Sequence, residues 1–168
     1  VMSNMAPQTC QFNRGIWQIL EGVVRLWAAE YRTVYVFSGS IFDRDGDGRR
    51  DPDAAAARML SNNGQRRVAV PTAFFKVVAV QQPDGSVDTQ TFIMAHNEEN
   101  PKGDVAVAYL QNNLRTLAAV EELTGLNLFP SRPTIREAHA LWPFKRSNMP
   151  NSLCHAHPDP RFQAIWAQ

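Results

Sequence analysis

The sequence contains no long apolar run, few cysteines and no excess of charge of either sign. No apolar stretch reaches the roughly 18–20 residues that cross a bilayer as a helix, so no membrane partner is expected. The 17 basic and 16 acidic residues nearly cancel, which gives no overall basic charge of the kind that usually accompanies nucleic-acid binding. Local pairs such as Arg49-Arg50, Arg66-Arg67 and Lys145-Arg146 are interpreted as solvated surface.

The two cysteines, Cys10 and Cys154, lie far apart in the chain and match no zinc-binding spacing. They either close a disulfide in an oxidising compartment or remain free thiols. The chain begins at Val1 without an initiator methionine or a visible signal peptide, as a processed or shortened product would. Localisation is therefore unknown, with secretion or export preferred.

Length and composition indicate a globular protein with a buried core. The chain has 168 residues, of which 44% are apolar and 20% charged, and this fits one domain over residues 1–168. Within it we expect an insertion loop at about residues 43–65 and an irregular tail at about residues 149–168.

The first hundred residues predict one long helix followed by strands. Residues 12 to about 32 read as an amphipathic helix because apolar residues recur every three or four positions. These are Ile16, Ile19, Leu20, Val23, Leu26 and Trp27. Residues 33–37 predict a strand that ends at 38–40, residues 67–80 contain a second with Pro71 at its start or edge, and residues 91–95 predict a third.

The remaining chain predicts less regular structure. Residues 83–85 indicate a turn, and residues 98–104 indicate a loop. A short helix is expected over residues 118–123, ended by Gly125 in a left-handed conformation. A second helix is expected over residues 134–141, before Pro143.

Asn13, Glu21 and Arg25 mark a candidate site on the long helix. Asn13 stands near the helix start, where its amide can cap free N–H groups, but an amide oxygen is also a ligand that magnesium accepts. Glu21 lies about 80° around and about 12 Å along an ideal helix from Asn13. The two can share a metal site if Glu21 holds a metal-bound water or if the helix start departs from ideal geometry. Taken alone, Glu21 and Arg25 are interpreted as a surface ion pair, although Arg25 could also reach a phosphate.

Four segments, in order, resemble the DNA/RNA non-specific endonucleases, which are ββα-metal nucleases. The first joins Ser3-Asn4-Met5-Ala6-Pro7-Gln8, Asn13-Arg14-Gly15-Ile16-Trp17 and Leu20-Glu21. The others are Tyr35-Val36-Phe37-Ser38-Gly39-Ser40-Ile41-Phe42, Val68-Ala69-Val70-Pro71-Thr72-Ala73-Phe74-Phe75-Lys76-Val77-Val78 and Glu121-Glu122-Leu123-Thr124-Gly125-Leu126. Ser40 stands where the family has proline. The similarity covers about residues 2–130.

This resemblance implies an α+β, ββα-metal (His-Me finger) fold, in which a central antiparallel sheet is flanked by helices and the N-terminal part is absent from this chain. It implies that Asn13 is the one protein ligand of a catalytic Mg²⁺ or Mn²⁺, that Glu21 orders the water around the metal, and that Asn4 supports the site. Arg25 is then a candidate for contacting phosphate. The implied activity is metal-assisted hydrolysis of DNA and RNA without sequence preference, with a histidine as general base.

The Asp-Arg-Gly-His motif that carries the family's catalytic histidine occurs nowhere in the chain. His96 is interpreted as structural, His139 as part of a helix, and His155 with His157 as a weak metal-binding pair. The base therefore comes from a separate N-terminal polypeptide, or was lost by truncation, or the chain is an inactive relative. The first two explanations are favoured, because an inactive relative has little reason to keep the metal residues.

A second candidate site is an acidic loop after the first strand. Asp43, Asp45 and Asp47 occupy positions one, three and five of a calcium-loop pattern, with Gly48 at position six and Asp51 at position nine. Ala54 replaces the acid expected at position twelve. The loop predicts a structural Ca²⁺ site or, alternatively, a solvated turn. The alternative function for the whole chain is a non-catalytic binding or regulatory module that keeps this calcium loop.

Overall fold

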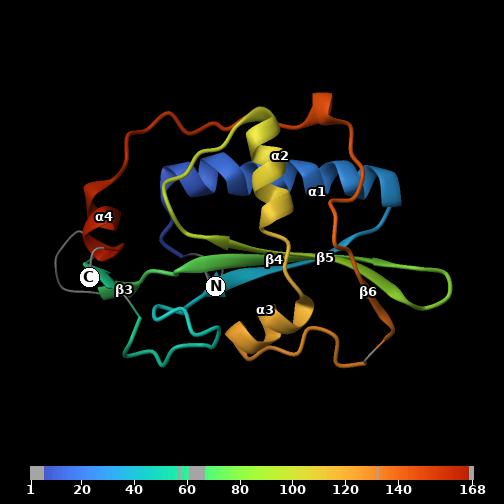
Figure 1. Ribbon diagram of the computed structural model, residues 1–168, viewed down its shortest axis with the longest axis horizontal. Coiled ribbons are helices and arrows are strands. Elements are labelled where there is room, and N and C mark those ends of the chain that lie inside the picture. Colours follow the sequence, from blue (N-terminus) through green and yellow to red (C-terminus); the bar gives the residue numbers. More distant parts are fainter. Residues whose placement is uncertain (1–5, 57, 61–66, 132, 167–168) are drawn as a thin grey trace.

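The computed structural model describes residues 6–56, 58–60, 67–131 and 133–166, which form a mixed α+β structure around a four-stranded sheet (Figure 1). The strand order is β1 (Tyr35–Ile41), β4 (Ala73–Gln81), β5 (Val87–Ala95) and β6 (Ile135–Glu137). Neighbouring strands are antiparallel except for β5 and β6, which run parallel. A separate antiparallel pair joins β2 (Arg58–Leu60) to β3 (Arg67–Ala69). None of the described helices is long and apolar enough to cross a membrane.

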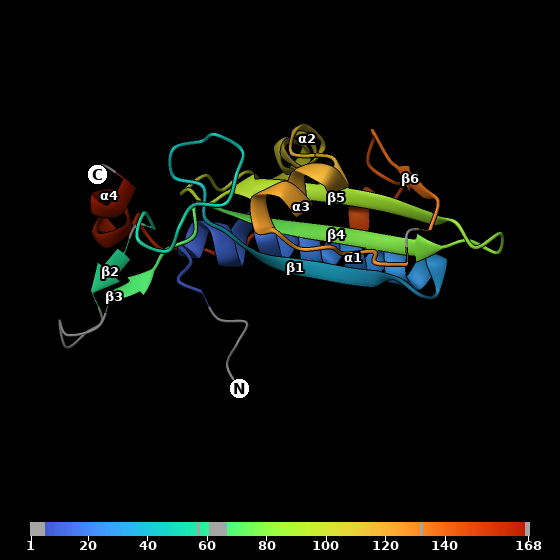
Figure 2. The same ribbon diagram turned by 90° about the horizontal axis from the view of Figure 1, so that it is seen from below.

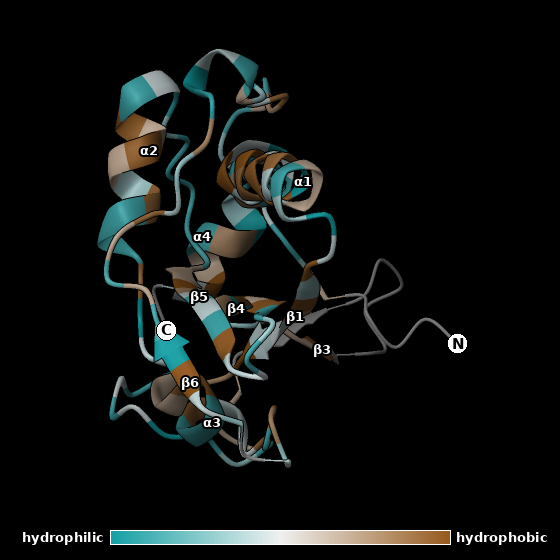
Figure 3. Cartoon of the chain, turned by 90° about the vertical axis from the view of Figure 1, so that its right-hand side faces the viewer, coloured by the Kyte–Doolittle hydropathy of each residue, from teal (hydrophilic) through white to brown (hydrophobic). Residues whose placement is uncertain are grey.

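Helices cover both faces of the main sheet. One face carries a π-helical turn, η1 (Phe12–Trp17), which continues into α1 (Gln18–Tyr31), and also α2 (Gly103–Asn112). The other face carries α3 (Leu117–Thr124), as the views in Figures 2 and 3 show. Alternate residues of β4 serve the two cores: Phe74 and Val78 pack toward α1, whereas Phe75 and Val77 pack toward α3.

The predicted long helix is confirmed, and its apolar stripe is the part that is buried. Ile19, Leu20, Val23 and Trp27 are almost fully excluded from solvent. The helix ends at Tyr31, and Arg32 follows with a positive φ of 63°. The short helix that was expected near residues 118–123 is also confirmed, and Gly125 ends it in the left-handed conformation with φ 70°.

The first strand is longer than predicted. Residues 38–40 do not end it but pair with residues 74–76 of β4. The ring of Phe75 explains why position 39 is a glycine inside this strand, because a Cβ at Gly39 would lie 2.8 Å from its Cε1. Its presence reflects a close approach of a side chain to the backbone rather than a turn.

Two later predictions were wrong. Residues 134–141 do not form a helix; Ile135–Glu137 add to the sheet as β6, and His139 lies in an exposed bend. The tail over residues 149–168 is not wholly irregular, because it contains a final helix, α4 (Pro160–Trp166); a short 3₁₀ turn, η2 (Arg146–Asn148), lies just before the tail. Sequence analysis also missed α2, whose buried side chains Ala106 and Leu110 pack on the α1 side of the core.

Candidate metal and nucleic-acid site

The predicted metal ligand, Asn13, lies in the helical turn η1, which is kinked at Gly15. Gly15 within this turn has non-helical dihedrals, with φ −104° and ψ −111°. The helix start therefore departs from ideal geometry, which is one of the two conditions under which Asn13 and Glu21 can share a site. The segment is thus a helix interrupted by a kink at Gly15 rather than a regular π-helix.

Asn13 does not cap the helix, contrary to the simpler interpretation of its position. Thr9 does so instead: its Oγ1 accepts a hydrogen bond from the Phe12 N–H at 3.1 Å, and its carbonyl accepts one from the Asn13 N–H at 2.9 Å. The Asn13 side chain is exposed and has no hydrogen-bond partner within the described part of the chain. Its amide oxygen is thus available to an external ligand.

Glu21 and Arg25 follow on successive turns of α1. Glu21 is partly buried in the first turn, and Arg25 is exposed. Neither residue takes part in any of the ion pairs found among the described residues. The interpretation of the two as a surface ion pair is therefore wrong, and both charges face other partners or solvent. Asn4, the remaining predicted site residue, lies outside the described residues.

Lys76 is a charged residue that sequence reasoning did not assign to the site. It projects from β4 toward α1 and is only 5% exposed, with its Nζ 4.3 Å from the centroid of the Trp17 ring. Burial lowers the pKa of Lys76, and the nearby charge of Glu21 acts in the opposite direction. A lysine between the apolar residues Phe75 and Val77 of a predicted strand was the signal available in the sequence.

His96 is structural, as predicted. Its ring is 3% exposed and its Nε2 accepts a hydrogen bond from the Thr9 N–H at 3.0 Å. Its Nδ1 lies 2.9 Å from the Pro71 carbonyl, so the neutral ring carries its proton on Nδ1. Burial lowers the pKa of His96 below its ordinary value. The histidine thereby fixes Thr9, which caps the turn that carries Asn13.

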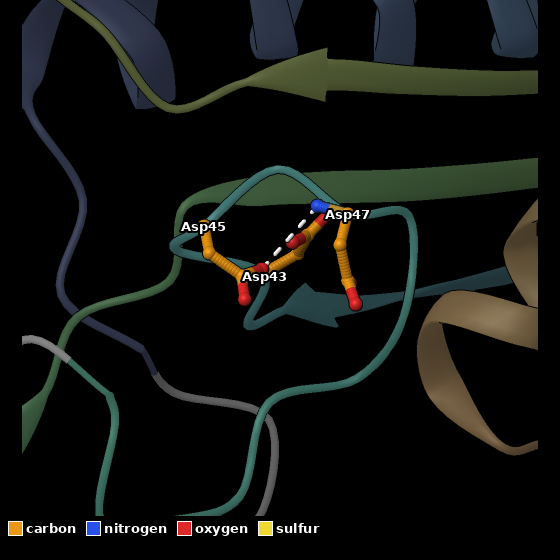
Figure 4. A group of neighbouring side chains, drawn as sticks. All are labelled: Asp43, Asp45 and Asp47. Carbon is orange, nitrogen blue, oxygen red and sulfur yellow. Dashed lines mark hydrogen bonds between the residues drawn. The ribbon is translucent and has the colours of Figure 1, made fainter.

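Three carboxylates of the acidic loop lie together (Figure 4). Asp43, Asp45 and Asp47 each offer an oxygen, and the three oxygens lie within 4.8 Å of one another. Asp43 accepts hydrogen bonds from the Gly46 and Gly48 N–H groups at 2.9 and 3.2 Å. Carboxylate oxygens that converge in this way are the donor type that calcium takes.

Asp51 does not join this group. Its Oδ2 accepts a hydrogen bond from the Arg44 N–H at 2.6 Å, and its own N–H donates to the Phe42 carbonyl at 2.9 Å. These two bonds close the neck of the loop. Among the described residues, the group of potential metal ligands contains neither Asp51 nor the pair His155 and His157.

The two cysteines are joined: Cys10, just before the π-helical turn, forms a disulfide with Cys154 in the tail, and their Cα atoms are 5.6 Å apart. The alternative of two free thiols is thereby wrong. The bond links the start of the site helix to the C-terminal part of the chain, 144 residues later.

A helix that presents an amide, a carboxylate and a guanidinium above a mostly antiparallel sheet is consistent with a ββα-metal nuclease fold. The chain belongs to the DNA/RNA non-specific endonuclease family, whose match covers residues 1–135.

Individual relatives show the same similarity. The chain is 31% identical to human mitochondrial endonuclease G over 130 residues, which are 77% of this chain and 41% of the human protein. It is 34% identical to nuclease C1 of Cunninghamella echinulata var. echinulata over 131 residues, covering 76% of this chain and 47% of that protein. The chain thus spans less than half the length of either of these relatives.

Proposed function

We propose that this chain is the C-terminal, metal-binding portion of a nuclease domain that hydrolyses DNA and RNA without sequence preference. The observation that carries the proposal is the exposed Asn13 amide, which is not used for capping and lies on a kinked helical turn inside the family match. The names of its relatives, endonuclease G and nuclease C1, support the same activity.

Each residue of the helix has a separate role in this proposal. Asn13 would hold Mg²⁺ or Mn²⁺ through its amide oxygen, a hard ligand that suits either ion. Glu21 orients water beside that position, and Arg25 contacts a phosphate of DNA or RNA from the exposed side of α1. Asn4 supports Asn13. When bound, the metal neutralises charge on the scissile phosphate and on the leaving oxygen.

The general base is proposed to come from polypeptide that precedes this segment in the complete nuclease, or from a separate N-terminal chain. None of the four histidines of this chain suits the role. His96 is buried with both ring nitrogens engaged, and His139, His155 and His157 are exposed outside the site helix. The greater length of the relatives supports the existence of such additional polypeptide.

The decisive variant is Asn13→Ala, with Asn127→Ala as a matched control at an exposed asparagine in a loop. In the complete nuclease, meaning this chain together with the polypeptide that carries Asp-Arg-Gly-His, Asn13→Ala should reduce cleavage of both plasmid DNA and RNA by at least about 100-fold. Electron paramagnetic resonance of Mn²⁺ with this chain alone should show the matching loss of affinity. Full cleavage by Asn13→Ala would exclude Asn13 as the metal ligand.

The second candidate function is a non-catalytic binding or regulatory module, favoured by the convergence of Asp43, Asp45 and Asp47 into a possible Ca²⁺ site. Calorimetry should detect Ca²⁺ binding that Asp45→Asn weakens and that Glu99→Gln, at an exposed site elsewhere, leaves unchanged. Equal Ca²⁺ binding by Asp45→Asn would exclude this loop. If a companion polypeptide with Asp-Arg-Gly-His confers no cleavage, the module is the better description of the protein.

A further inference from the structure

The C-terminal tail lies directly on the segment that carries Asn13. The part concerned, residues 149–156, is called the tail strap below. In Figure 1 it belongs to the red trace that runs alongside α1 from η2 toward α4. Pro150 packs so closely on α1 that a Cβ at Gly22 would lie 2.1 Å from its Cγ, which explains why a glycine stands inside this helix.

Two connections hold the residues immediately before Asn13. The disulfide binds Cys10 to Cys154 of the tail strap. The Gln11 side chain, 5% exposed, donates from Nε2 to the Ala156 carbonyl at 3.1 Å. One covalent bond and one partly buried hydrogen bond therefore fix two consecutive residues of the chain just ahead of the η1 turn.

A third connection satisfies a backbone group immediately after Asn13. In a regular α-helix the Gln18 N–H would donate to the Arg14 carbonyl, but here it donates to the Gly15 carbonyl. The Arg14 carbonyl instead accepts a hydrogen bond from the Leu153 N–H at 2.7 Å and one from Ser152 Oγ at 3.4 Å. The tail strap thus supplies donors at the point where the helix departs from ideal geometry.

A neighbouring loop closes the same arrangement. The Asn100 Nδ2 donates to the Cys154 carbonyl at 3.4 Å, and a Cβ at Gly15 would lie 2.8 Å from Asn100 Oδ1. Gly15 therefore allows the loop and the tail strap to approach the turn from outside the helix. The π-helical turn is held by contacts on both sides of Asn13, at Cys10, Gln11, Arg14 and Gly15.

We propose that the tail strap, through the Cys10–Cys154 disulfide and its hydrogen bonds to Gln11 and Arg14, is a positioning segment that sets the kink of the turn at Gly15 and thereby the direction of the Asn13 amide. This inference rests on the proposed metal role of Asn13. The strap lies beyond residue 135, where the family match ends. It therefore adds to the family's site residues a positioning element from a part of the chain outside the match.

The test compares variants of the strap with a variant that weakens the fold elsewhere. Cys10→Ala/Cys154→Ala removes the disulfide, and Gln11→Met removes one hydrogen bond but keeps the disulfide. Val77→Ala is the matched control, because Val77 is fully buried on the opposite face of the sheet, toward α3. Far-UV circular dichroism establishes that each variant is folded, and Mn²⁺ affinity and amide hydrogen exchange are then measured.

In the double cysteine variant, exchange of the amides of residues 12–17 should accelerate more than exchange of the β4 amides, and Mn²⁺ affinity should fall about tenfold. Gln11→Met should show the same pattern to a smaller extent, and it replaces the double variant if that variant does not fold. Val77→Ala should leave Mn²⁺ affinity unchanged. Equal acceleration in both segments, or unchanged affinity in the folded strap variants, would overturn the positioning role.

The two proposals fail in different ways. If Asn13→Ala binds Mn²⁺ as well as the unchanged protein does, the metal role of Asn13 fails. Amide exchange then decides on its own whether the strap sets the conformation of residues 12–17. If Asn13→Ala abolishes binding but the strap variants bind normally, the metal role stands and the positioning role is wrong.

Discussion

At the scale of single residues, His96 gives the protein a specific dependence on pH. It is buried, its two ring nitrogens bond to Thr9 and Pro71, and burial lowers its pKa in the folded state. Aromatic rings surround it, so an imidazolium at this position would lack water around its charge. These rings belong to Phe12, Phe74, Phe162 and Trp166. Unfolding exposes the ring and restores a pKa near 6.5.

The folded protein therefore binds fewer protons than the unfolded protein once the pH falls below about 6.5. The contribution of neutral His96 is fully present above that pH and is lost as the pH falls toward the lowered folded-state pKa. Urea unfolding should show the free energy of unfolding decreasing between pH 6.5 and 5 by up to about 1.4 kcal/mol per pH unit.

Asp84 and Asp159 also have lowered pKa values in the folded protein. Because the ordinary pKa of these carboxyls is 3.8, they affect stability only at a pH below the range in which His96 acts. Titration of His96 by NMR supplies the direct check on the prediction. A folded-state pKa above 6.5, or stability that does not change between pH 6.5 and 5, would contradict it.

At the scale of helices and strands, the elements predicted correctly were those whose conformation is determined by residues close together in the sequence. The stripe of α1 and the Gly125 end of α3 were found because a 3.6-residue period and a left-handed glycine are visible in a short window. β6 was misjudged because Ile135–Glu137 become a strand only by pairing with β5, nearly fifty residues earlier in the chain. Arg136 secures that pairing with bonds to Asp84 and Asp88.

The candidate site was predictable to a similar extent. The resemblance identified Asn13, Glu21 and Arg25 by their residue types and their spacing. The sequence pattern does not show the kinked turn η1 or the capping by Thr9, because both are features of three-dimensional structure. Lys76 and the tail strap were missed because both act through contacts between distant segments. The pairing of Cys10 with Cys154 was left open for the same reason, since sequence spacing does not show which thiols meet.

At the scale of the whole molecule, the disulfide closes a loop that contains most of the chain. Its cysteines are separated by 144 residues, and from loop-closure entropy such a cross-link stabilises the folded state by about 5 kcal/mol. This is comparable to the entire free energy of unfolding of many domains. Removing it with Cys10→Ala/Cys154→Ala should therefore lower the free energy of unfolding by about 3–5 kcal/mol, mainly because the conformational entropy of the unfolded chain increases.

Guanidinium denaturation checks this prediction, because a less constrained unfolded state exposes more surface. The double variant should unfold at a lower denaturant concentration and with a steeper dependence of free energy on denaturant than the cross-linked protein. Single replacements of Cys10 or Cys154 should match the double variant, since either one breaks the same bond. An unchanged midpoint would mean that the tail is held by its noncovalent contacts alone, among them the seating of Phe162 and Ile165 of α4 against Val70. The outcome thus determines whether the covalent link or the packed tail contributes most of the stability that supports the Asn13 turn.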